Sequence, residues 1–124
     1  MTYEWRIRRV AANEASFRDI NERLEAGLRQ VRHTPELLRF ICECGDRGCE
    51  QAVSLTFDEY EAVRRDSRRF AVVPGHVWPE TERIVAGNDR YEVVEKFGPA
   101  VELTDAADRR ELGLSGRRSR DATP

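Results

Sequence analysis

Long apolar runs, a secretion signal and known catalytic motifs are all missing from this sequence. No stretch of about twenty apolar residues occurs, and no cationic N-terminal segment leads into an apolar one, so membrane insertion and secretion are both unsupported. The sequence also lacks the glycine-rich nucleotide loops, the G-x-S-x-G elbow, the H-E-x-x-H helix and the zinc-deaminase signature. Because no catalytic set can be recognised, we expect the protein not to be an enzyme.

Lysine is almost absent, since Lys96 is the only lysine among 21 basic residues. We attribute this bias to a GC-rich coding genome, which favours Arg codons, and derive no mechanism from it. The formal net charge of −2 and the pI of about 5.8 argue against a surface that is basic throughout. Local arginine clusters nevertheless keep a nucleic-acid-binding or transcription-associated protein open as an alternative, with phosphate contacts from Arg64, Arg65, Arg68 and Arg69.

Cysteine is scarce too, but the three cysteines lie within eight residues. They form the pattern Cys42-x-Cys44-x4-Cys49, and three thiols cannot pair off completely as disulfides within one chain. Thiolates together with imidazole are the usual ligands of structural Zn²⁺, which takes four of them in a tetrahedron. We therefore predict one Zn²⁺ per chain, with Gly45 and Gly48 allowing the tight turn that the thiols need.

The fourth ligand has to come from elsewhere, and His76 is the better candidate. It follows Pro74-Gly75, a turn dipeptide at the end of an apolar strand, whereas the runner-up, His33, has no such anchor. In the competing interpretation the cysteines are ordinary small apolar residues. Strand alternation weakens it, because Cys42 and Cys44 would share one face with Glu43 on the other.

The remaining patterns predict one α+β domain of 124 residues. Residues 1–33 are expected to form a long amphipathic helix, residues 34–103 a zinc-stapled core, and residues 104–124 a polar, disordered tail. In the core, we predict a hairpin from 38–44 and 50–55, a helix from a capping box at Thr56, and a strand at 70–73. A second hairpin is predicted around residues 86–89, although a helix starting at Pro79 is an alternative.

The N-terminal helix carries an apolar stripe with three-, four- and seven-residue spacing, made of Val10, Phe17, Ile20, Leu24, Leu28 and Val31. Such a stripe packs either on its own domain or on a partner helix. A coiled coil is weakened by Asn13 and Gly27, which fall at the complementary inward positions.

Several segments together resemble a group of small uncharacterised actinobacterial proteins. The similar segments are the C-x-C-x4-C pattern, Leu55-Thr-x2-Glu-Tyr-Glu61, Pro74-Gly-His76 and the stretch from Asn13 to Arg23. The resemblance covers about residues 10–97, favours His76 over His33 and implies a cytoplasmic location. It implies no activity.

Taken together, these patterns favour a small cytosolic zinc-binding interaction or regulatory module. Its partner would be another protein or a second copy, bound through the N-terminal helix. Besides nucleic-acid binding, a thiol redox sensor is an alternative, because zinc-bound thiolates can be oxidised.

Overall fold

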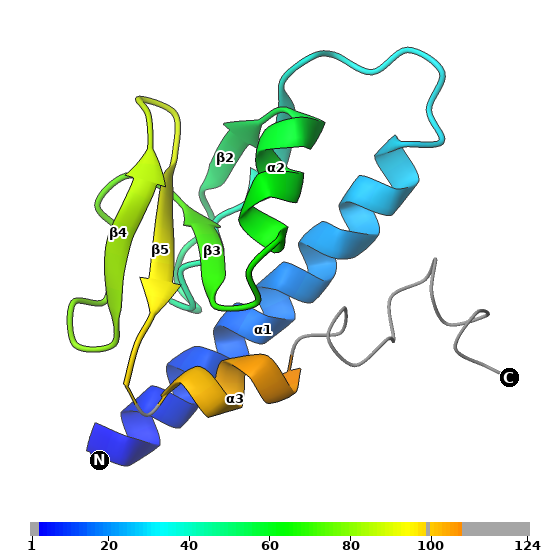
Figure 1. The fold of residues 1–124 in the computed structure, drawn as a ribbon. Helices are drawn as coiled ribbons and strands as arrows, with labels where there is room; N and C mark the ends of the chain where they lie inside the picture. The colour runs from blue at the N-terminus through cyan, green and yellow to red at the C-terminus, as the bar shows by residue number, and fades with distance from the viewer. Residues whose placement is uncertain (1–2, 99, 108–124) are drawn as a thin grey trace, which may run out of the picture.

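The computed structural model describes residues 3–98 and 100–107 (Figure 1). The tail predicted for 108–124 lies outside the described residues. Within the described residues eight elements follow one another: α1 (Tyr3–Leu28), β1 (Leu38–Ile41), β2 (Ala52–Leu55), α2 (Phe57–Arg64), β3 (Arg69–Val72), β4 (Glu82–Gly87), β5 (Glu92–Lys96) and α3 (Ala100–Ala107). None of the helices described here is long and apolar enough to cross a membrane.

The strands form two small antiparallel sheets, and with the helices they confirm the predicted α+β class. β1 pairs with β2, and the second sheet has the order β3-β5-β4. The two sheets are joined where the chain leaves β1, because the amide of Glu43 donates to the carbonyl of Ala71 in β3 (2.9 Å). The hairpin prediction for the β4–β5 region holds, and the helix alternative starting at Pro79 is wrong, since β4 begins at Glu82.

The core consists of two apolar clusters. The larger one includes the stacked rings of Phe40 and Tyr60, whose centroids lie 4.4 Å apart. The smaller one is built from Phe70, Val72 and Val94 together with Cys42 and Cys44. The cysteine sulfurs therefore occupy positions that apolar side chains would otherwise fill.

Helix α2 starts as its sequence predicts. The amide of Glu59 donates to the Thr56 hydroxyl (3.0 Å), and the Glu59 carboxylate accepts from the Thr56 amide (2.9 Å). Both bonds satisfy donors that a helix N-terminus leaves unpaired. Tyr60 and Val63 are buried beneath this helix, and Phe57 is half-buried against the same core cluster.

Helix α1 buries the apolar stripe predicted for it only in part, with Leu24 and Leu28 half-buried against the larger core cluster. Ile20 remains 47% exposed, and Val31 is 52% exposed in the turn after the helix ends. The residues that α1 does bury lie about one position away on the helix: Ile7, Ala11, Glu14, Arg18, Asn21 and Glu25. Their spacing alternates between four and three residues, so the buried stripe is helical in period but largely polar in composition.

Each polar residue of this stripe has at least one polar partner, which reduces the free-energy cost of its burial. Asn21 donates to the carbonyl of Ile41 and accepts from its amide, both at 2.9 Å, in the way that a neighbouring strand would. Arg18 donates to the carbonyl of Ser67 (2.8 Å), and its guanidinium lies 4.5 Å from the centre of the Phe70 ring. Hydropathy alone does not identify this buried face of α1, because most of its residues are polar.

Glu14 belongs to a buried ionic cluster with Lys96 and Glu82. The ammonium of Lys96 lies 2.8 Å from a carboxylate oxygen of Glu14 and 3.0 Å from one of Glu82. All three side chains are almost fully enclosed, and the Lys96 ammonium also donates to the hydroxyl of Thr81 (3.3 Å). This cluster ties α1 to both strands of the β4–β5 hairpin.

Helix α3 packs across the N-terminal half of α1 (Figure 1). It begins within the segment predicted as core and extends to Ala107, into the segment predicted as tail.

Candidate metal centre

The cysteines lie on the tip of the β1–β2 hairpin, in residues 42–49, which we call the cysteine loop. The amide of Cys42 donates to the carbonyl of Gln51 (3.0 Å), which continues the β ladder up to the first thiol. Two further bonds close the tip, from the Cys49 amide to the Asp46 carbonyl (2.9 Å) and from the Gly48 amide to the Asp46 carboxylate (2.8 Å). The third thiol is thereby turned back toward the first two.

Gly45 lets the cysteine loop lie directly against α1. Its φ of +82° is one that residues with a side chain seldom adopt, and a Cβ there would meet Cγ of Glu14 at 2.7 Å. The carbonyl of Gly45 accepts from the side chain of Asn13 (2.9 Å). Helix α1 therefore supports the cysteine loop through close contact with the loop backbone at Gly45.

His76 reaches the cysteines from the turn that follows β3. The amide of His76 donates to the carbonyl of Val73 (2.9 Å), and Gly75 has a φ of +91°. The amide of Gly75 donates to the carboxylate of Glu92 in β5 (2.8 Å). This tight turn places the imidazole against the cysteine loop, as the Pro-Gly-His pattern predicts.

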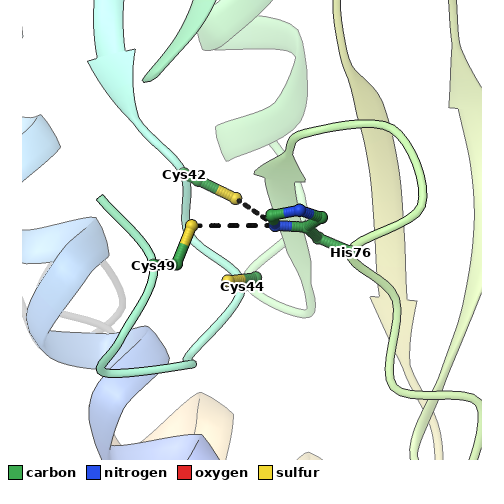
Figure 2. Close-up of side chains that lie close together, drawn as sticks. All are labelled: Cys42, Cys44, Cys49 and His76. Atoms are coloured by element: carbon green, nitrogen blue, oxygen red, sulfur yellow. Dashed lines mark hydrogen bonds between the residues drawn. The ribbon is translucent and has the colours of Figure 1, made fainter. Parts of the chain in front are cut away.

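The four side chains point toward one another (Figure 2). Nδ1 of His76 lies 3.5 Å from Sγ of Cys42 and 3.7 Å from Sγ of Cys49, and all four ligand atoms, including Sγ of Cys44, lie within 4.8 Å of one another. Zn–S and Zn–N bonds of usual length would place tetrahedral ligand atoms about 3.6 Å apart. His33, the runner-up, is exposed and does not belong to this group.

The cluster favours negative charge on one of its three sulfurs, that of Cys44. Hydrogen bonding with Cys42 lowers the pKa of the Cys44 thiol to about 5, and the same contact, together with burial, raises the pKa of Cys42. Burial raises the pKa of Cys49. The amide of Val73 donates to Sγ of Cys42 (3.2 Å), and such a bond stabilises a thiolate. The thiolate is the form that binds metal, so the lowered pKa of Cys44 favours metal binding.

Glu43 supports the cysteine loop in a way that the sequence did not predict. The strand pattern places it on the face opposite the thiols, but it is fully buried, not solvated. Its carboxylate accepts from the Tyr60 hydroxyl (2.7 Å), the Asn21 side chain (2.9 Å) and the Ala71 amide (3.0 Å). Burial raises the pKa of Glu43 despite these donors. Glu43, which lies between Cys42 and Cys44 in the sequence, thus links the cysteine loop to α1, α2 and β3.

Trp78 also contacts the cysteine loop. Its indole N–H donates to the carbonyl of Cys44, and its own amide donates to the carboxylate of Glu82 (2.9 Å). Glu82 in turn pairs with Lys96. The cysteine loop and the buried ionic cluster are therefore connected through hydrogen bonds and an ion pair.

The donor set fits a metal ion such as Zn²⁺. Three sulfurs and one imidazole nitrogen suit Zn²⁺ in both number and softness, and two of the four residues are buried and two half-buried. Bound metal would contribute cross-linking between a hairpin tip and a turn that are distant along the chain. Its charge would also stabilise the thiolates.

The arginines of the nucleic-acid alternative do not form a free basic patch. Arg64 is buried and pairs with Glu22 (2.7 Å), while Arg69 lies 3.0 Å from Glu95. Arg68 lies 3.6 Å from Asp105, and Arg65 is exposed. Three of the four guanidinium groups are thus paired with carboxylates of the same chain.

Fold and site together define a small α+β protein whose three cysteines and one histidine are close enough to bind a metal. Comparison of the chain with protein-family models, with curated proteins and with solved structures finds no match. The resemblance to small actinobacterial proteins therefore stays a prediction, and the function has to be argued from the site.

Proposed function

We propose that this protein is a non-enzymatic interaction module whose fold is held by one Zn²⁺ bound to Cys42, Cys44, Cys49 and His76. The observation that carries the proposal is the convergence of three sulfurs and Nδ1 of His76 within 4.8 Å. The ligands come from two segments that the fold has to bring together. A metal bound by both would stabilise the native state by an amount that matches or exceeds the net stability of a small domain, about 5 to 15 kcal/mol.

A closed set of four protein ligands supports a structural role for the metal. A catalytic zinc keeps one position for water, and hydrolytic chemistry depends on that water. Substitution of Co²⁺ for Zn²⁺ tests this point. We expect an absorption spectrum of tetrahedral, thiolate-bound Co²⁺ that does not change between neutral and mildly alkaline pH, because no metal-bound water is present to titrate. A spectrum that titrates there would contradict the structural assignment.

The metal itself is tested by elemental analysis of protein purified without chelators. We expect about one zinc per chain, reduced by Cys44→Ser and by His76→Ala. His33→Ala is the matched control and should leave the zinc content unchanged. A native protein without stoichiometric transition metal would overturn the proposal.

The partner in this proposal is another protein or a second copy, bound through the outer face of α1. Support comes from Ile20, whose side chain remains 47% exposed on this helix while the inner face is occupied by the domain itself. Light scattering of the full chain tests self-association, and Ile20→Glu should then shift the protein to monomer. Ile84→Glu, at a residue 49% exposed on β4, is the control, and equal effects of the two substitutions would contradict a role for α1.

A further inference from the structure

A hollow of about 200 Å³ opens beside the metal centre. It is lined by Cys44, Asp46, His76, Val77 and Trp78. Sites for whole small molecules usually measure about 300 to 1,000 Å³, so this one has room for the end of a single side chain. It is formed by the cysteine loop on one side and by the segment after His76 on the other.

Metal binding would make the charge around the hollow negative. Three thiolates and one imidazole around Zn²⁺ leave a formal charge of about −1 on the centre, and the exposed carboxylate of Asp46 adds another. The Gly48 amide donates to Asp46 (2.8 Å) and so holds this carboxylate in place. Arg47 is exposed but is not among the residues that line the hollow, so it does not supply the matching cation.

The aromatic wall of the hollow is also held in place. Trp78 is half-buried, and hydrogen bonds to Cys44 and Glu82 fix its indole and its backbone amide. An indole is the best aromatic partner for a cation, and a planar guanidinium can stack on it while donating to a carboxylate. A wall that is ordered before binding also lowers the entropic cost of complex formation.

We propose that this hollow binds an arginine side chain of a partner protein, with the guanidinium between the Trp78 indole and the Asp46 carboxylate. The inference rests on the proposed function, because the negative charge of the centre comes from metal-bound thiolates. It adds a chemically specific contact to the interaction module. The contact lies next to α1, since the loop that carries Asp46 packs against that helix at Gly45.

The test is an NMR titration of the zinc-loaded full chain with the capped tripeptide Gly-Arg-Gly. The reporters are the indole N–H of Trp78 and the amides of Asp46 and Val77. We expect saturable shifts with a Kd in the millimolar range, as suits one side chain. Peptides with citrulline or lysine in place of arginine should bind at least about fivefold more weakly, since citrulline lacks the charge and lysine the planar group.

Asp46→Asn should weaken binding of the arginine peptide about fivefold, as expected for an exposed ion pair. Asp89→Asn, at an exposed aspartate in the β4–β5 turn, is the matched control and should leave the Kd unchanged. Zinc content is measured first for each protein. Protein without stoichiometric zinc would overturn the proposed function and this inference with it. Fully loaded protein that binds the three peptides equally, or shows shifts only elsewhere, would overturn this inference alone.

Discussion

Lys96, the only lysine of the chain, is buried between two carboxylates. Burial alone disfavours its ammonium, but the facing charges of Glu14 and Glu82 outweigh that effect and raise the pKa of Lys96. The coding bias that explains the scarcity of lysine does not explain this position. The ammonium of lysine is compact enough to lie between both carboxyl groups, whereas the guanidinium of arginine is larger and planar.

Lys96→Met should destabilise the protein by about 3 to 5 kcal/mol, because it leaves the buried acidic groups of Glu14 and Glu82 without their cationic partner. Arg83→Met is the control on the adjacent strand, where the side chain is 67% exposed and pairs with Glu95, and it should cost less than about 1 kcal/mol. Urea denaturation of the zinc-loaded proteins measures both. Equal losses would show that the buried cluster contributes nothing particular to stability.

Glu14 should make the stability depend on pH. Burial raises the pKa of Glu14 well above its ordinary value of 4.5. At a pH above 4.5 the unfolded chain releases the Glu14 proton, whereas the folded protein still holds it. The free energy of unfolding therefore falls as pH rises. Glu14→Gln removes this effect. As pH rises above 4.5, the wild type should lose more stability than the variant, and parallel urea midpoints would contradict the assignment.

At the scale of elements, the largest departure from the sequence-based expectation is the face that α1 buries. The apolar residues Phe17 and Leu24 are half-buried at the sides, while Glu14, Arg18 and Asn21 form the centre of the interface. Hydropathy predicts the period correctly, because the helix has to turn one stripe inward. Hydropathy misses which face turns inward, because the groups that pair with these polar residues lie on β1, on β5 and between α2 and β3, far along the chain.

The contact between α1 and the cysteine loop leads to a prediction for two glycines of one turn. Gly45→Ala should cost more than about 1 kcal/mol, because φ is positive there and the new methyl group would lie 2.7 Å from Cγ of Glu14. Gly48→Ala is the matched control, since its Cβ meets only a side-chain oxygen of Asp46 at 3.4 Å, and the change should stay within about 0.5 kcal/mol. Thermal unfolding compares the two. A more severe effect at Gly48 would contradict the described packing.

At the scale of the whole molecule, a metal bound to the four side chains would join the cysteine loop of one sheet to the turn after β3 of the other. Cys42 and Cys44 also belong to the smaller core cluster with Phe70, Val72 and Val94. Loss of metal would therefore place repelling or reprotonated thiols inside the core, in addition to removing a cross-link.

Removal of the metal by a chelator should lower the melting temperature markedly and speed amide hydrogen exchange at Val73, whose N–H bonds to Sγ of Cys42. The reason is that binding energies of about 10 to 16 kcal/mol in zinc-finger peptides exceed what a small core usually retains. The same chelator should change nothing further in His76→Ala, which serves as the control. Equal melting temperatures with and without metal would contradict a structural role.

Much of this architecture could be predicted from local patterns. The capping box at Thr56, the hairpins around the cysteine loop and residues 86–89, and the strand before His76 depend on neighbouring residues, and the structure contains each of them. Glu43 shows the limit of such reasoning. Alternation with the cysteines places Glu43 on the opposite face, but it does not reveal that a tyrosine, an asparagine and a backbone amide from three distant elements enclose its carboxylate there.

By itself the sequence determined the α+β class, the helix and strand periods and the four side chains able to bind a metal, because propensity, turn chemistry and ligand type act over a few residues. Only the tertiary structure shows that His76 reaches the thiols while His33 stays exposed, that α1 buries a polar face, and that a hollow lined by Asp46 and Trp78 opens beside the thiols. These outcomes depend on which groups become neighbours after folding, and burial of a charge is stable only when its partner arrives with it.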